Sequence, residues 1–225
     1  MFGAWQAGAW RALEPVFHPD LVVGASVGAL NGYAIAAGWN ADHLCGWWRE
    51  PQSFAQLHAV IRSLMAERPL ELRYAAVLVD PLRMRPRTFV GAEVTARHLL
   101  ASCAVPGVLP PRYIDGAWYL DGGLLNPLPV WTAVELGATR IVALNSLPEI
   151  PSALLKPFVK GFRAIFGHHP PLPSGVTVLT IVPGRRLGSM TDALRWSREN
   201  VERWIGQGAA DARDAALDAQ KTFPL

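Results

Sequence analysis

Ser26 is the residue of this sequence best placed to act as a nucleophile, because it stands in the run Gly24-Ala25-Ser26-Val27-Gly28. The stretch just before this run is apolar and β-branched, which predicts a short buried strand. The small residues after it predict a helix. A sharp strand-to-helix turn would lift the hydroxyl toward the first amides of that helix, which stabilise negative charge. We expect a Cβ at Gly24 or at Gly28 to clash within such a turn. Alone, Gly-x-Ser-x-Gly is equally compatible with an ordinary turn.

A serine hydroxyl needs a base to accept its proton, and Asp121 is the candidate. It ends a predicted strand and is followed by Gly122 and Gly123, which leave its carboxylate uncrowded. If that strand lies near the strand before Ser26, the two side chains meet at the sheet edge where open α/β sheets bind ligands. Partial desolvation would raise the basicity of the carboxylate, so a Ser–Asp dyad is chemically sound. The alternative is that Asp121 only forms an Asp-Gly turn.

Strands and helices alternate along the chain, which predicts an α/β fold built as a three-layer α/β/α sandwich with a mainly parallel central sheet. Predicted strands cover residues 21–23, 74–80, 112–114, 117–120, 140–145 and 176–182, with an edge strand or loop at 83–89. Asp115-Gly116, between two of these strands, predicts a hairpin turn. Predicted helices cover residues 4–14, 29–37, 94–104, 129–136, 192–205 and 209–219, with two more within 41–67. No repeat or linker interrupts this order, so we expect residues 1–225 to form a single domain.

Composition restricts the class of protein. Of the 225 residues, 51% are hydrophobic and 17% charged, which is typical of a globular chain with a sizeable core. A net charge of +3 is too mild and too dispersed for a nucleic-acid partner. Cys45 and Cys103 lie in apolar surroundings, and we expect both to be buried free thiols in a reducing cytoplasm. No cysteine and histidine cluster has metal-ligand spacing, so we expect no metal and no cofactor. Apolar runs are too short for a membrane-spanning helix.

A basic, amphipathic segment begins at Pro157. As a helix it would place Phe158, Phe162, Ile165 and Phe166 on one face and Lys160 and Arg163 on the other. Such a helix suits peripheral docking on a bilayer surface. It equally suits an ordinary surface helix packed on the sheet.

The sequence resembles the patatin-like phospholipase family, in its bacterial form. The Gly24–Gly28 run matches the family's Gly-x-Ser-x-Gly, and Asp121-Gly122-Gly123 matches its Asp-Gly-Gly/Ala motif. Residues 101–111 look like its Ala-Ser-x-Ala-x-Pro-x-x-Phe-Pro-Pro block, with Leu109 in place of the phenylalanine. The likeness covers residues 3–145. It implies that Ser26 is the nucleophile and Asp121 the proton acceptor of a lipid acyl hydrolase of lipid degradation, acting on a lipid ester without a histidine.

One departure from the family concerns the oxyanion loop. The family has a Gly-Gly-Gly-x-Arg/Lys-Gly run before its first helix, preceded by a short strand, whereas here Gly3 alone corresponds to the end of that run. Losing one oxyanion donor costs about 10²–10³ in rate, and losing the strand would uncover part of the sheet. Two explanations stay open. The printed start is internal to a longer gene product, which we favour, or the chain is a truncated and inactive homologue.

Two other functions compete with a serine lipid acyl hydrolase located in the cytoplasm or peripheral to a membrane. The first is an α/β-hydrolase with a triad of Ser26, Asp121 and either His168 or His169, although such enzymes have several strands before the serine turn. The second is a non-catalytic lipid-binding or scaffold protein, which the absent glycine run favours.

Overall fold

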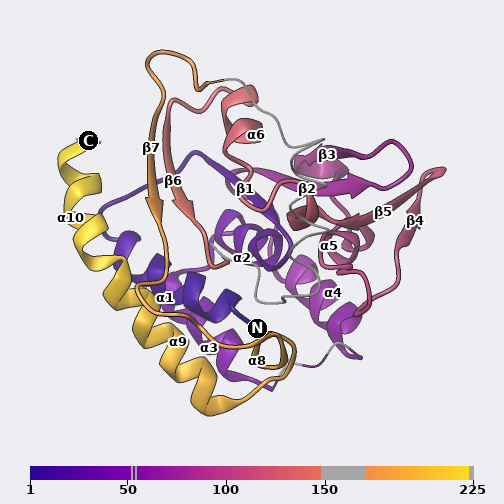
Figure 1. The fold of residues 1–225 in the computed structure, drawn as a ribbon, viewed down its shortest axis with the longest axis horizontal. Helices are drawn as coiled ribbons and strands as arrows, with labels where there is room; N and C mark the ends of the chain where they lie inside the picture. The colour runs from indigo at the N-terminus through magenta and orange to yellow at the C-terminus, as the bar shows by residue number, and fades with distance from the viewer. Residues whose placement is uncertain (52, 54, 148–170, 223–225) are drawn as a thin grey trace.

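In a computed structural model of the protein, the structure describes residues 1–51, 53, 55–147 and 171–222, and they form an α/β fold with helices around a central sheet (Figure 1). The helices are α1 (Gly3–Leu13), α2 (Val27–Ala36), α3 (Ala41–Arg49), α4 (Leu57–Glu67), α5 (Ala96–Ser102), α6 (Val130–Glu135), α8 (Met190–Leu194), α9 (Arg198–Asp211) and α10 (Arg213–Thr222). The strands are β1 (Leu21–Ala25), β2 (Arg73–Asp80), β3 (Arg85–Val90), β4 (Arg112–Ile114), β5 (Ala117–Asp121), β6 (Arg140–Leu144) and β7 (Thr177–Ile181). The amphipathic segment from Pro157, His168 and His169 lie outside the described residues.

Strand β2 organises the larger sheet, because three strands pair with it. β3 runs antiparallel along one edge of β2, from Ala75 to Asp80. The other edge is shared: β1 runs parallel to β2 and ends with Ala25 opposite Val77, and β5 pairs antiparallel with the next two residues of β2. The carboxyl ends of β1 and β5 therefore meet on one edge of β2.

Parallel pairing joins β1 to β2 and β6 to β7, whereas the β2–β3, β2–β5 and β4–β5 pairs are antiparallel, so the larger sheet is mixed. β4 and β5 are joined by Asp115 and Gly116, whose φ angles of 46° and 84° are both positive. A two-residue turn of this kind matches the twist of an antiparallel hairpin. The hairpin predicted at Asp115-Gly116 is thus confirmed.

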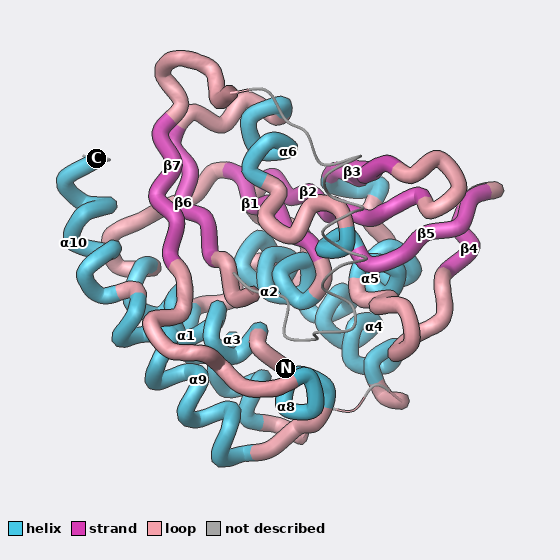
Figure 2. Tube along the Cα trace, in the orientation of Figure 1, coloured by secondary structure: helices cyan, strands magenta, loops and turns pink. Residues whose placement is uncertain are grey.

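Helices cover both faces of the sheet, and Figure 2 shows α6 on the opposite side from α1, α3 and α9. Alternation along the strands explains this: Val22 and Val142 pack against the larger core with α1 and α2, whereas Val23 and Ile141 pack against α6. Between β1 and β6 lies a cavity of about 450 Å³, lined by both strands and by α2 and α6. Within the described residues, no strand pairs with the edge of β1 that faces this cavity.

Helix α9, in the C-terminal part of the chain, packs closely along α1, and glycines allow the approach. A Cβ added to Gly8 would lie 2.1 Å from the carbonyl oxygen of Ile205, and one added to Gly208 would lie 2.0 Å from that of Trp5. Because both obstacles are backbone atoms, neither position accepts a side chain without moving a helix.

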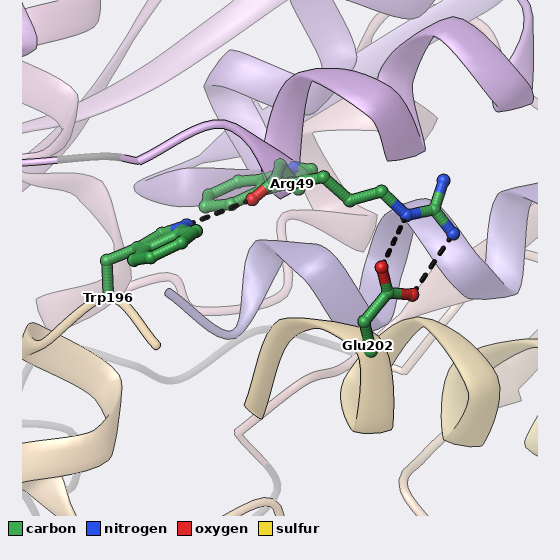
Figure 3. A network of polar contacts seen from close by, with 4 residues as sticks. Arg49, Trp196 and Glu202 are labelled. Atoms are coloured by element: carbon green, nitrogen blue, oxygen red, sulfur yellow. Dashed lines mark hydrogen bonds and ion pairs between the residues drawn. The ribbon is translucent and has the colours of Figure 1, made fainter. Parts of the chain in front are cut away.

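Polar contacts join α9 and the loop before it to α3. Figure 3 shows the Arg49 guanidinium donating to both carboxylate oxygens of Glu202, at 2.9 and 3.2 Å. The Trp196 indole donates to the backbone carbonyl of Trp48 at 3.2 Å. These contacts connect the helix that follows α2 with the C-terminal part of the chain.

The prediction of one long helix over residues 192–205 is wrong. The chain forms α8, leaves helical geometry at Arg195, and begins α9 after Ser197, whose side chain accepts from the Asn200 amide. Serine is a favoured N-cap, so it starts a new helix here rather than continuing the old one. The strand and helix predictions before residue 147 agree with the structure to within a few residues at each end.

Both cysteines, Cys45 and Cys103, are buried and free, as expected. In the described part of the chain, no helix combines the length and apolarity needed to cross a membrane.

Candidate active site

Ser26 lies at the junction of β1 and α2 in a strained conformation, with φ 55° and ψ −134°. Positive φ is uncommon for any residue other than glycine and costs on the order of 1–3 kcal/mol, so the surroundings must hold it. The turn is tight: a Cβ added to Gly24 would lie 2.2 Å from the carbonyl oxygen of Gly28. The structure therefore has the sharp turn that the sequence predicts at Ser26.

The steric prediction is right for Gly24 and wrong for Gly28. A Cβ at Gly28 would meet only the side chain of Gln6, at 3.5 Å, which is an ordinary van der Waals distance. The reason is direction, because Gly24 faces the first turn of α2 whereas Gly28 faces a side chain of α1. Gly28 is therefore not required by the shape of the turn.

The Ser26 hydroxyl donates a hydrogen bond of 2.6 Å to Oδ2 of Asp121, across 95 positions of sequence. The other carboxylate oxygen, Oδ1, accepts from the Gly123 amide at 2.7 Å. Asp121 is 4% exposed, so its carboxylate is held on both sides in an almost dry position. The structure thus brings together the two side chains that the sequence singles out.

The two glycines after Asp121 have separate steric roles. A Cβ on Gly122 would lie 2.0 Å from the carbonyl oxygen of Val77, so only glycine lets the chain pass β2 here. A Cβ on Gly123 would lie 2.9 Å from Oδ1 of Asp121 and 3.9 Å from Cβ of Ser26. Gly123 therefore keeps space open beside the hydroxyl and the carboxylate.

Burial changes the acidity of the carboxyl group. Desolvation raises the pKa of Asp121 to about 7 from its ordinary value of 3.8, and the hydrogen bonds from Ser26 and Gly123 oppose this rise. A carboxylate of this basicity accepts a proton near neutral pH far more readily than an exposed one. Among the described residues, its hydrogen bonds come from Ser26 and Gly123 and not from a histidine.

Gly3 lies beside the residue that follows Ser26. A Cβ on Gly3 would lie 2.3 Å from both Cγ2 of Val27 and a ring carbon of Trp48, and its carbonyl accepts from Asn31 at 2.9 Å. The start of α1 is therefore packed against the start of α2. A role for Gly3 as an oxyanion donor stays a prediction.

Sequence reasoning did not single out Ser102. Its hydroxyl oxygen accepts a hydrogen bond of 2.9 Å from the backbone amide of Ser26. The only signal in the sequence was a polar residue at the end of an apolar helix, inside the block of residues 101–111.

An apolar hollow of about 470 Å³ lies near the end of β5. It is lined by Leu120 and by the proline-rich loop of residues 106–111. Ser26 and Asp121 line neither this hollow nor the cavity between β1 and β6, although Gly24, Ala25 and Gly28 line that cavity. The described residues contain no group of three or more histidine, cysteine, aspartate or glutamate side chains able to hold a metal ion.

Comparisons with known proteins find a family model and several relatives that match this chain. A family model described as patatin-like phospholipase matches residues 1–56 and 66–134, which is more than half of the chain and includes Ser26 and Asp121. Uncharacterized NTE family proteins of Mycobacterium bovis (strain ATCC BAA-935 / AF2122/97) and of Mycobacterium tuberculosis (strains CDC 1551 / Oshkosh and ATCC 25618 / H37Rv) are 35% identical over 92 residues. That match covers 40% of this chain and 25% of the length of each relative.

Proposed function

Because the chain belongs to the patatin-like phospholipase family, we propose that it is a serine lipid acyl hydrolase in which Ser26 is the nucleophile and Asp121 the base. The observation that carries this proposal is the 2.6 Å hydrogen bond from the Ser26 hydroxyl to Asp121 at a strained strand-to-helix turn. A nucleophile in hydrogen-bond contact with a base, which is itself oriented by a third group, is the arrangement that activates a serine. Here the third group is the Gly123 amide.

The reaction proceeds in two steps. Oγ of Ser26 attacks the acyl carbonyl carbon while its proton passes to Oδ2 of Asp121; the ester C–O bond then breaks, and the proton moves to the leaving alcohol. Water next attacks the acyl-enzyme and gives a proton to Asp121. The acyl–Oγ bond breaks, the proton returns to Oγ, and a fatty acid is released.

Backbone amides at the start of α2 are the proposed donors to the developing oxyanion. The first amides of a helix lack intrahelical acceptors and carry the positive end of the helix dipole. The Ser26 amide is already engaged by Ser102, which leaves those of Val27 and Gly28 for this role. Each donor of this kind is worth about 10²–10³ in rate.

An apolar hollow near the end of β5 is a candidate site for an acyl chain. It is formed by the loop of residues 106–111 and by Leu120, the residue before Asp121. Such a chain is favoured by removal of its surface from water. The proposal names the acyl group alone.

The experiment is hydrolysis of lysophospholipid and of a soluble p-nitrophenyl ester, followed by fatty acid and nitrophenol release. We expect turnover by the wild type, none by Ser26→Ala, and unchanged turnover by Ser174→Ala, which removes an exposed hydroxyl before β7. Retained activity in His168→Ala/His169→Ala would remove the triad alternative. Vesicle binding by a wild type that turns over neither ester would contradict the proposal and favour a lipid-binding protein.

A further inference from the structure

Ser102 lies at the C-terminal end of α5 and is fully buried, although it is polar. It belongs to the block of residues 101–111, and the proposed chemistry gives Ser102 itself no role. A buried hydroxyl must have hydrogen-bond partners to avoid a desolvation penalty, so its partners indicate what it does.

Both partners of Ser102 are backbone groups at the dyad. Its oxygen accepts from the Ser26 amide at 2.9 Å, and its hydrogen is donated to the carbonyl oxygen of Val77 at 2.9 Å. A hydroxyl is the smallest side-chain group that does both at once. Ala25, the last residue of β1, pairs with Val77, so the Ser102 hydroxyl bridges the chain that leaves β1 to the middle of β2.

The same segment holds the base. Two residues after Ser102, the carbonyl oxygen of Ala104 accepts from the backbone amide of Asp121 at 3.1 Å. The segment of residues 102–104 is thus attached to the backbone of both Ser26 and Asp121. This attachment spans the meeting point of β1 and β5 on the edge of β2.

We infer that Ser102 is a positioning residue for the proposed hydrolysis: by holding the Ser26 amide, it fixes the strained backbone from which Oγ reaches Asp121. The expected effect of Ser102 on the rate rests on the proposed function. The contact between Ser102 and the Ser26 amide rests on geometry alone. Without the hydroxyl, the Ser26 amide and the Val77 carbonyl lose a buried partner, and the positive φ of Ser26 loses its restraint.

The test compares Ser102→Ala with Cys45→Ala, which also shortens a fully buried side chain by one atom, but on α3. We expect Ser102→Ala to lower kcat by about 10²-fold with little change in KM, since misplacement of a reacting group by an ångström costs that much. Cys45→Ala should keep the wild-type kcat. Ser102→Thr retains the hydroxyl and should recover most of the rate.

A second readout separates positioning from stability. The Ser26 hydrogen bond lowers the pKa of Asp121, so a displaced hydroxyl should move the rising limb of the rate against pH to higher pH in Ser102→Ala. A merely structural role would lower the melting temperature and leave that limb in place. If Ser102→Ala does not fold, Ser102→Cys carries the comparison, because a thiol is a weak donor and a weak acceptor.

Hydrogen exchange of the Ser26 amide, followed by NMR, makes the outcome independent of turnover. We expect slow exchange in the wild type and in Cys45→Ala, and fast exchange in Ser102→Ala. Wild-type kcat and pH profile in a folded Ser102→Ala would overturn the inference and leave the hydrolase proposal standing. If the wild type hydrolysed no ester, the hydrolase proposal would be refuted. Fast exchange of the Ser26 amide in Ser102→Ala would then still support the contact between Ser102 and that amide.

Discussion

Ser26 and Asp121 approach each other from opposite directions along one edge of β2. Ser26 follows β1, whose last residue lies opposite Val77, and Asp121 ends β5 opposite the next residue, Leu78. The antiparallel course of β5 turns its carboxyl end toward that of β1, so the hydroxyl and the carboxylate meet at 2.6 Å. This relationship is the geometric basis of the proposed dyad of Ser26 and Asp121.

The rate of ester hydrolysis should rise with pH through a pKa near 7. Burial raises the pKa of Asp121 to about 7, and only the deprotonated carboxylate accepts the serine proton. Measuring kcat/KM for a soluble ester from about pH 5 to about pH 9 checks this. A rate that does not change across that range would show that no group of this acidity acts as the base.

Asp121→Asn should abolish turnover and yet stabilise the fold above neutral pH. Between its unfolded pKa of 3.8 and its folded pKa of about 7, the native protein holds a proton that the unfolded chain releases. The free energy of unfolding of the wild type therefore falls as pH rises through this window, and the asparagine variant lacks this loss. Urea unfolding at about pH 8 should show a gain on the order of 1–4 kcal/mol, which vanishes below about pH 4. An equal or lower stability of the variant at about pH 8 would contradict the raised pKa.

Gly24→Ala and Gly28→Ala should differ sharply although both lie in the same motif. The Cβ at residue 24 meets a backbone oxygen at 2.2 Å, whereas the Cβ at residue 28 meets a flexible side chain at 3.5 Å. We expect Gly24→Ala to lose activity together with at least about 2 kcal/mol of stability, and Gly28→Ala to fold like the wild type. Thermal unfolding of the two variants measures the contrast, and equal melting temperatures would refute the described turn.

Gly208→Ala and Gly206→Ala provide a matched pair on α9. A Cβ at residue 208 would lie 2.0 Å from the carbonyl oxygen of Trp5, whereas nothing lies within 4 Å of one at residue 206. We expect Gly208→Ala to destabilise by about 2 kcal/mol or more and Gly206→Ala to stabilise by about 0.5–1 kcal/mol, since alanine is the better helix former. Chemical unfolding curves decide, and a stabilising Gly208→Ala would rule out the close packing of α1 with α9.

The sequence predicted the parts of the fold that depend on local pattern. Apolar runs located β1 and β2, the Asp115-Gly116 pair located the β4–β5 hairpin, and glycines around Ser26 located the turn. The direction of β5 along β2 could not be predicted, because it follows from a pairing between residues far apart in the chain. The cavity between β1 and β6 could not be predicted either, because it is formed by residues far apart in the chain.

The sequence predicted the two reacting side chains of the candidate site, but not the residue that holds the backbone of Ser26. Ser26 and Asp121 carry recognisable motifs, whereas Ser102 acts through a backbone amide in a different element, which no local pattern indicates. The error at Gly28 has a similar cause: which glycine is sterically required depends on what faces it, and α1 presents only the Gln6 side chain there. The break between α8 and α9 was signalled by Ser197, a good N-cap, whose effect exceeded that of the helical periodicity.

Covalent labelling by a fluorophosphonate tests the central claim most directly. The probe should add one phosphonyl group to the wild type, found at Ser26 by mass spectrometry of peptides, and none to Ser26→Ala. Asp121→Asn should be labelled about 10²–10⁴-fold more slowly. Labelling that persists in Ser26→Ala, or labelling of Asp121→Asn at the wild-type rate, would contradict a hydrolase built on these two residues.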